Sequence, residues 1–171
     1  MSLPVSGEDG AGSFRIGQGY DIHRLVVGRP LVLAGVTLPW DLGLEGHSDG
    51  DAVCHALADA LLGASGMGDI GHHFPSDDPK WKDAASIKLL GAVAMMLDEA
   101  GYAVQNVDLT IILEVPRIGP YREEMIGKVA EALRVPPGQV GLKAKSNDRL
   151  GPVGSGEAIA VLAVALVHKR S

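Results

Sequence analysis

Asp21, His23 and His55 are the residues whose types and spacing best fit a chemical role. Asp21 and His23 lie two positions apart in a stretch that reads as a strand, so their side chains point to one face. His55 comes from a segment that reads as a helix. One carboxylate and two imidazoles make three ligands of a zinc site, and a catalytic zinc keeps its fourth position for water or substrate. The trio therefore predicts a metal centre that does chemistry.

The segment around His55 supports this interpretation. Asp51, His55 and Asp59 recur every four residues, which puts them on one face of the predicted helix. A solvated face is one explanation, but such faces usually carry Lys and Glu. We therefore predict a ligand histidine flanked by carboxylates that orient its ring. Cys54 lies about 100° further round the helix and is predicted to pack in the core.

Composition limits the classes of protein that fit. The 171 residues carry a net charge of −6 with no basic run, which argues against a nucleic-acid-binding surface. The single cysteine fits a reducing compartment, and no run approaches the roughly 20 apolar residues of a membrane span. Residues 1–13 are rich in Gly and Ser and are predicted to be a disordered tail. We expect one domain over residues 14–171, in a soluble, cytoplasmic protein.

The periodicity of the chain predicts an α+β fold, with a mixed β-sheet and helices packed on one face. The final apolar segment, 154–168, is compatible with either strand or helix. The other elements expected are a strand at 14–21, two short strands within 31–39, a loop at 39–46, a helix from Asp49 or Asp51 to about Leu62, a long loop at 66–81, a helix from Asp83 or Ser86 to about Ala100, a strand at 106–113, a helix at 121–133 and a strand at 140–144.

Five motifs, taken together, resemble the 2-C-methyl-D-erythritol 2,4-cyclodiphosphate synthase family. They are Arg-Ile-Gly-Gln-Gly-Tyr-Asp-Ile-His at 15–23, His-Ser-Asp-Gly-Asp at 47–51, His-Ala-Leu-Ala-Asp-Ala-Leu-Leu-Gly at 55–63, Gly-Asp-Ile-Gly at 68–71 and Lys-Ala-Lys-Ser-Asn-Asp-Arg-Leu-Gly at 143–151. The resemblance implies a homotrimer with active sites between subunits, a zinc ion and a second divalent ion, Mg²⁺ or Mn²⁺. It implies that 4-diphosphocytidyl-2-C-methyl-D-erythritol 2-phosphate cyclises with release of CMP. It also implies that the final apolar segment is a strand.

The resemblance also implies roles for individual residues. Asp21, His23 and His55 match the zinc ligands, and Asp148 matches the ligand of the second metal. His47, Lys145 and Ser146 match residues that act in catalysis. The implied substrate contacts are Asp21, His23, His47, Ser48, Asp69, Gly71, Pro116, Arg117, Ile118, Gly119, Ala144, Lys145, Ser146 and Asp148, with 116–119 receiving the cytosine and 145–146 the diphosphate.

Three positions depart from the family pattern. Asp148 stands where many relatives carry Glu, and one methylene less still leaves a carboxylate for Mg²⁺. Ser76 replaces an Asp in the loop after Phe74-Pro75, and Ser155 replaces an Arg near the expected trimer axis. The loss of this arginine weakens the expectation that an isoprenoid phosphate binds in the central cavity of the trimer. The adjacent His72 and His73 are expected to be loop residues, and His168 a surface residue.

Two alternatives fit the metal and phosphate chemistry. A zinc-dependent phosphoesterase would use the same ligands, but it needs a clear general base for water beside the metal. A non-catalytic, metal-stabilised trimeric scaffold would hold zinc entirely through protein ligands.

Overall fold

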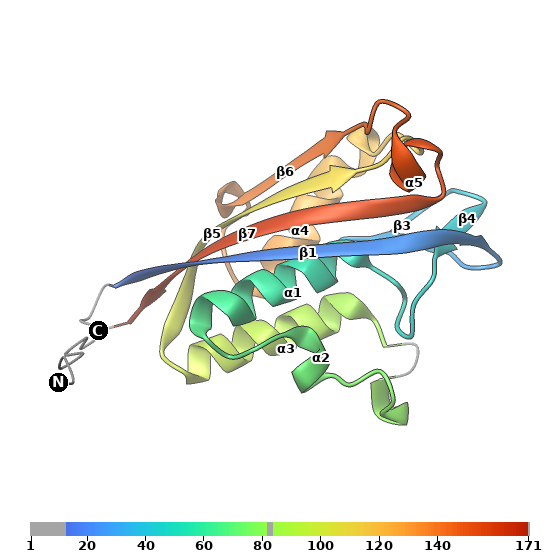
Figure 1. Ribbon diagram of the computed structural model, residues 1–171. Helices are drawn as coiled ribbons and strands as arrows, with labels where there is room; N and C mark the ends of the chain where they lie inside the picture. The colour runs from blue at the N-terminus through green and yellow to red at the C-terminus, as the bar shows by residue number, and fades with distance from the viewer. Residues whose placement is uncertain (1–12, 82–83, 171) are drawn as a thin grey trace, which may run out of the picture.

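The computed structural model describes residues 13–81 and 84–170 (Figure 1). Its strands are β1 (Phe14–Val27), β2 (Leu31–Leu33), β3 (Val36–Leu38), β4 (Leu42–Leu44), β5 (Tyr102–Ile112), β6 (Val140–Lys145) and β7 (Ala158–Lys169). Its α-helices are α1 (Ala52–Ser65), α2 (Ile70–His73), α3 (Ser86–Glu99), α4 (Arg122–Leu133) and α5 (Gly151–Gly154). Three 3₁₀ turns are η1 (Pro79–Trp81), η2 (Gly119–Tyr121) and η3 (Pro137–Gln139).

Five strands form one mixed sheet in the order β4-β1-β7-β5-β6, and β2 pairs with β3 as a separate hairpin. The β1–β4, β1–β7 and β5–β7 pairs are antiparallel. The β5–β6 pair is parallel, because α4 lies between these strands in the chain and returns it to the same end of the sheet. The sheet is therefore mixed, as predicted.

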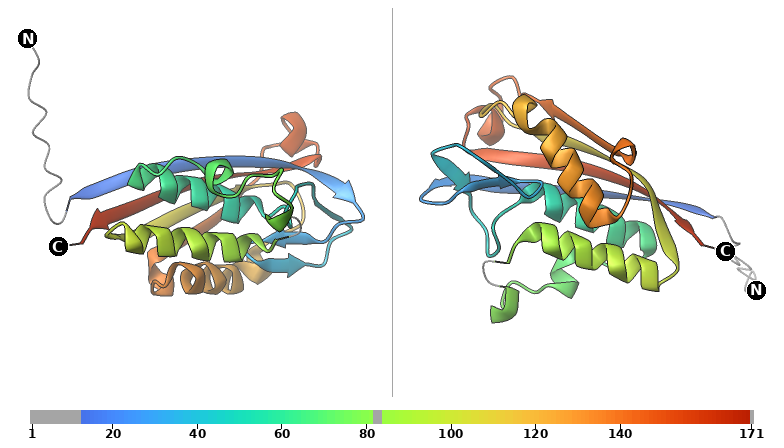
Figure 2. Two further views of the ribbon diagram at one scale, coloured as in Figure 1. Left: turned by 90° about the horizontal axis from the view of Figure 1, so that it is seen from below. Right: turned by 180° about the vertical axis from the view of Figure 1, so that it is seen from behind.

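One face of the sheet is covered by α1, α3 and α4 (Figure 2). The short α5 lies at the end of the sheet, outside this helical layer. The core lies between helices and sheet, and contains alternate residues of β7 (Ile159, Val161, Ala163, Ala165, Val167) together with Leu57, Leu61 and Leu62 of α1. The predicted α+β architecture with its helical layer is confirmed, except for α5.

Alternation along β1 decides which side chains meet α1. Gly17 and Gly19 are buried on the helical side, followed on the same side by Asp21 and His23. Side chains on the opposite side, such as Ile16 and Tyr20, are exposed. Because the two glycines have no Cβ, α1 lies directly on the backbone of β1.

Several boundaries differ from the prediction. β1 continues to Val27, because its antiparallel pairing with β7 runs on through His23 and Arg24. The expected loop at 39–46 contains β4, which pairs with the end of β1. The expected loop at 66–81 contains α2 and η1. The apolar segment near the C-terminus is strand β7, as the resemblance implied. Apart from Ser13, the predicted tail lies outside the described residues, and so does Asp83.

Among the helices that the structure describes, none combines the length and the hydropathy needed to cross a membrane.

Candidate functional site

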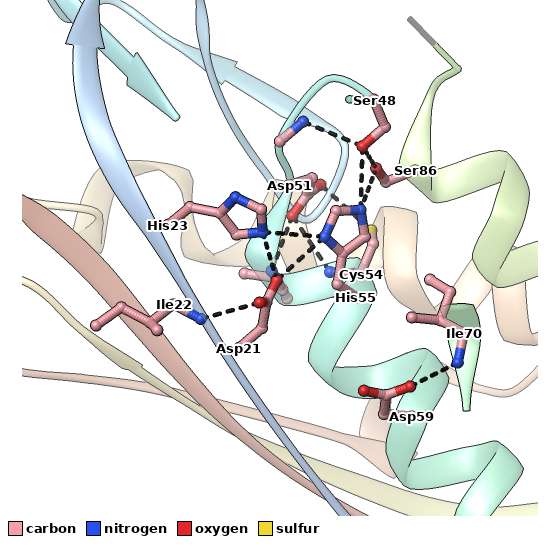
Figure 3. Close-up of polar contacts among 12 residues, drawn as sticks. Asp21, Ile22, His23, Ser48, Asp51, Cys54, His55, Asp59, Ile70 and Ser86 are labelled. Atoms are coloured by element: carbon pink, nitrogen blue, oxygen red, sulfur yellow. Dashed lines mark hydrogen bonds and ion pairs between the residues drawn. The ribbon is translucent and has the colours of Figure 1, made fainter. Parts of the chain in front are cut away.

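The side chains of Asp21, His23 and His55 converge on one point between β1 and α1 (Figure 3). His23 Nε2 is 2.8 Å and His55 Nδ1 is 3.1 Å from Asp21 Oδ2. The two ring nitrogens are 3.3 Å apart. In the described part of the chain, this is the one group of at least three His, Cys, Asp or Glu side chains whose ligand atoms lie this close together.

This triangle of donor atoms fits a divalent metal ion. Tetrahedral zinc with ligands at about 2.0–2.1 Å holds its ligand atoms about 3.3–3.4 Å apart, close to the separations seen here. The backbone carbonyl of Glu45 faces Nδ1 of His23 and can only accept a hydrogen bond. When His23 is neutral, Nδ1 therefore carries the proton and the lone pair of Nε2 points at the centre of the trio. Carboxylate and imidazole donors suit zinc and similar ions.

Contacts within the trio shift the pKa values of Asp21 and His23. Burial acts to raise the pKa of Asp21, but hydrogen bonds with His23 and His55 and the charge of both imidazoles lower it from 3.8 to about 2. The hydrogen bond with Asp21 raises the pKa of His23 above 6.5, against the lowering effect of burial. Binding of a metal ion at Nε2 of His23 therefore competes with protonation of that nitrogen.

The predicted carboxylate partners of His55 are wrong. Asp51 caps α1, accepting from the backbone N–H groups of Val53 and Cys54, and it also accepts from Ala34 and Gly35. A capping side chain turns back toward the first-turn N–H groups, so the four-residue spacing does not bring it to the ring. Asp59 accepts from the backbone of Ile70 at 2.8 Å and so anchors α2.

Two serines occupy the place expected for these acids. Nε2 of His55 lies 3.1 Å from Ser48 Oγ and 3.0 Å from Ser86 Oγ. Ser86, at the start of α3, is fully buried and its hydroxyl donates to Asp49. In the sequence Ser86 stood out only as a possible helix start, because the pairing of α3 with the loop before α1 is a tertiary contact.

Arg29 fixes the backbone of the loop that carries His47. Its guanidinium donates to the carbonyl oxygens of Gly46 (2.8 Å) and Ser48 (2.5 Å), on either side of His47. Gly50 closes the loop with φ +76°, and a Cβ there would meet the carbonyl oxygen of Leu44 at 2.5 Å. No sequence pattern points to Arg29, since its contacts depend on the turn after β1.

A cavity of about 410 Å³ opens beside the trio. Its lining includes His47, Ser48, Asp59, Gly71 and the segment Phe74–Asp77. The size is typical of a site for a small molecule. Of the predicted substrate contacts, Asp21, His23, His47, Ser48 and Gly71 line this cavity. Asp69 is the N-cap of α2 and accepts from the backbone of His72.

The predicted cytosine and diphosphate residues gather in a second cavity, of about 550 Å³. It is lined by Pro116, Arg117, Ile118, Gly119, Ala144, Lys145 and Ser146, among others. These come from the segment after β5 and from the end of β6, which the parallel pairing brings together. Among the described residues, none lines both cavities.

Asp148 lies just beyond this second cavity, in a loop that Glu114 organises. Oε1 of Glu114 accepts from the backbone of Asn147 (2.9 Å) and Arg149 (3.1 Å). Asp148 is exposed, has φ +50° and accepts from Ser146 Oγ at 3.2 Å. Sequence reasoning missed Glu114, whose signal is an acid placed directly after the apolar run of β5.

The remaining histidines lie outside the trio. His72 and His73 belong to α2 rather than to an irregular loop, and Nε2 of His73 lies 2.7 Å from the carbonyl oxygen of Met67. His168 is only partly exposed, with its ring against Phe14, because it lies in the long strand β7. The prediction of a surface residue was therefore wrong in degree. Cys54 is buried, as predicted.

Comparisons with known proteins agree on one family. The model of the YgbB family matches residues 14–168. The 2-C-methyl-D-erythritol 2,4-cyclodiphosphate synthase of Desulfatibacillum aliphaticivorans is 52% identical over 154 residues, which are 90% of this chain and 99% of that protein.

Two solved structures are also similar. The bifunctional IspDF of Campylobacter jejuni matches with a TM-score of 0.89 and 34% identity, over 93% of this chain and 43% of that one. A 2C-methyl-D-erythritol-2,4-cyclodiphosphate synthase in a CDP-bound form matches with a TM-score of 0.83 and 38% identity, over 90% of this chain and 99% of that one. The chain thus belongs to the YgbB family, the family of the 2-C-methyl-D-erythritol 2,4-cyclodiphosphate synthases.

Proposed function

We propose that this protein converts 4-diphosphocytidyl-2-C-methyl-D-erythritol 2-phosphate into 2-C-methyl-D-erythritol 2,4-cyclodiphosphate and CMP, a step of non-mevalonate isoprenoid precursor synthesis. The observation that carries the proposal is the convergence of Asp21, His23 and His55 beside a cavity, in a chain whose named relatives are this synthase. The CDP-bound relative supports a cytidine nucleotide as ligand. The buried free thiol of Cys54 supports a reducing compartment such as the cytoplasm.

Asp21, His23 and His55 would hold the zinc ion. Zinc bound there would polarise a phosphate oxygen of the substrate and orient the diphosphate. The substrate supplies its own nucleophile, because its 2-phosphate attacks the β-phosphorus and CMP leaves. The protein therefore has to position and neutralise the phosphates rather than provide a nucleophile.

The cavity beside the trio supplies contacts for the methylerythritol half. His47 is an exposed side chain held at the cavity by the Arg29 contacts on both sides of it, so its ring can donate to a phosphate oxygen. The hydroxyl of Ser48 lies against His55 on the wall of the same cavity, and it is assigned to the substrate beside the metal. Asp69 and Gly71 are assigned to the substrate hydroxyls.

The second cavity is assigned to the cytidine half. Backbone groups of residues 116–119 would meet the cytosine, and Lys145 and Ser146 would donate to the diphosphate. Asp148 offers one carboxylate to Mg²⁺ or Mn²⁺, which commonly binds through one or two carboxylates and substrate phosphates.

A homotrimer would bring the two halves together. The two cavities of one chain share no described lining residue, and we assign the two halves of one substrate to cavities of adjacent subunits. The open face of the sheet supports the assembly, since Ile16, Tyr20, Ile22 and Val164 are exposed there. A large exposed apolar surface of this kind marks an interaction site.

The reaction is tested by incubating the purified protein with the cytidyl substrate, zinc and magnesium. CMP and a cyclic diphosphate, identified by phosphorus NMR, are expected. Release of inorganic phosphate without cyclic product would favour a phosphoesterase, and no turnover of any phosphate ester would favour the scaffold.

Subunit sharing is tested by complementation. His55→Ala disables the trio and Lys145→Ala disables the second cavity, so each homotrimer alone should be inactive. Co-expressed with different tags and purified through both, mixed trimers should regain activity, because some interfaces combine an intact half from each subunit. Mixed trimers without activity would place the whole site within one chain.

A further inference from the structure

The outer nitrogen of His55 lies against the hydroxyls of Ser48 and Ser86 (Figure 3), and a hydrogen bond continues from Ser86 to the carboxylate of Asp49. Ser86 Oγ lies 3.0 Å from His55 Nε2 and 2.5 Å from Asp49 Oδ1. Asp49 Oδ2 also accepts from the backbone N–H of Ser86 at 3.1 Å. The carboxylate of Asp49 thus accepts hydrogen bonds from both the hydroxyl and the backbone N–H of Ser86.

The charge of Asp49 decides the direction of these bonds. An ionised carboxylate only accepts, so the hydroxyl proton of Ser86 is committed to Asp49. Ser86 Oγ then has only lone pairs left for its other neighbours. Any hydrogen bond that Ser48 Oγ, 3.1 Å away, or His55 Nε2 makes with this oxygen must therefore be donated by that neighbour.

This order of donors fixes the tautomer of His55. With the proton on Nε2, the lone pair of Nδ1 points at Asp21 Oδ2 and His23 Nε2, where a metal needs it. The opposite tautomer would place an N–H inside the trio and would prevent ligation. A hydrogen bond at the outer nitrogen commonly sets which nitrogen of a histidine binds metal.

We infer that Ser86 and Asp49 are positioning residues which hold His55 as the Nε2–H tautomer and so prepare Nδ1 for the metal. The inference rests on the metal site of the proposed function and adds to it a hydrogen bond from the start of α3 that orients a ligand. Ser86 is fully buried, so no water competes for its hydroxyl.

The test follows the tautomer in the metal-free protein and the metal affinity separately. Long-range nitrogen–proton NMR at alkaline pH reports which ring nitrogen of His55 carries the proton. Zinc affinity is measured by competition with a chelator. Ser86→Ala removes the acceptor and leaves the Ser48 hydroxyl free to donate to Nε2. Asp49→Asn removes the charge that commits the Ser86 proton.

Both variants should change His55 from one tautomer to a mixture. They should also weaken zinc binding about 10–100-fold, the usual effect of substituting a residue that hydrogen-bonds to a metal ligand. Ser86→Thr keeps the hydroxyl and should restore the single tautomer. Ser65→Ala, a buried serine bonded to carbonyls within α1, is the matched control and should leave both readouts at wild-type values.

Weaker binding with an unchanged tautomer would reduce Ser86 to a packing residue and overturn the inference, as would wild-type values in both variants. A wild-type protein that binds no zinc would instead contradict the proposed function. Thermal unfolding of each variant separates these outcomes from misfolding.

Discussion

Gly19 of β1 lies directly against the carbonyl oxygen of Ala56 in α1. A Cβ at position 19 would stand 1.8 Å from that oxygen, far inside any contact distance. This close approach sets the distance between the strand that carries Asp21 and His23 and the helix that carries His55. The geometry of the trio therefore depends on a glycine that is not part of it.

Gly19→Ala should destabilise the fold and disturb the metal site together. The methyl group meets backbone rather than a flexible side chain, so α1 must shift, at a cost of about 1–3 kcal/mol or more. Unfolding in urea and zinc competition measure the two effects. Gly63→Ala, in the same helix with open space around it, is the control and should stabilise by about 0.5–1 kcal/mol. Equal stability in the two variants would refute the close packing.

His55→Ala should abolish zinc retention and CMP release while the proposed trimer survives. Loss of a metal ligand should weaken zinc binding by more than the roughly 100-fold upper limit for substitutions of residues that only hold a ligand in place. Metal content after gel filtration and the CMP assay check this. His72→Ala, an exposed histidine in α2, should leave both unchanged. Dissociation of His55→Ala into monomers would assign the metal a structural role instead.

The metal-free and zinc-loaded proteins should respond to pH in opposite directions. The raised pKa of His23 stabilises the metal-free fold below pH 6.5, and this contribution is lost as the pH rises through that pKa. The lowered pKa of Asp21 stabilises the metal-free fold above pH 3.8, and this contribution is lost as the pH falls toward about 2. Zinc competes with the His23 proton, so its affinity should increase with pH.

Thermal unfolding between about pH 5 and pH 9, with zinc or with a chelator, checks these slopes. In His23→Gln the loss of metal-free stability above pH 6.5 should disappear. If the stability of the metal-free wild-type protein rose across that range, the raised pKa of His23 would be contradicted.

Val164→Glu should dissociate the proposed trimer. Val164 lies opposite Gln18 of β1 on the open face of the sheet, where a carboxylate would be buried on assembly without a partner. Sedimentation should show monomers, and activity should fall because neither cavity is then completed. Met95→Glu, an exposed residue of α3 on the helical side, is the control. A trimeric Val164→Glu variant would move the interface elsewhere.

The spacing of Asp21 and His23 determined that both face the same side of a strand, because side chains alternate in any strand. Asp51 was recognisable as a helix start for an equally local reason, and the motifs determined the family.

Tertiary structure decided everything that depends on contacts between distant segments. Nothing near Ser86 in the sequence points to His55, because their contact forms only when α3 packs beside α1. Asp51 and Asp59 share a face with His55, yet neither carboxylate bonds to its ring. The carboxylate of Asp51 accepts from the backbone of Ala34 and Gly35, and that of Asp59 accepts from the backbone of Ile70. The separation of the ligand trio from Lys145 likewise follows from the order of strands in the sheet, which no local pattern encodes.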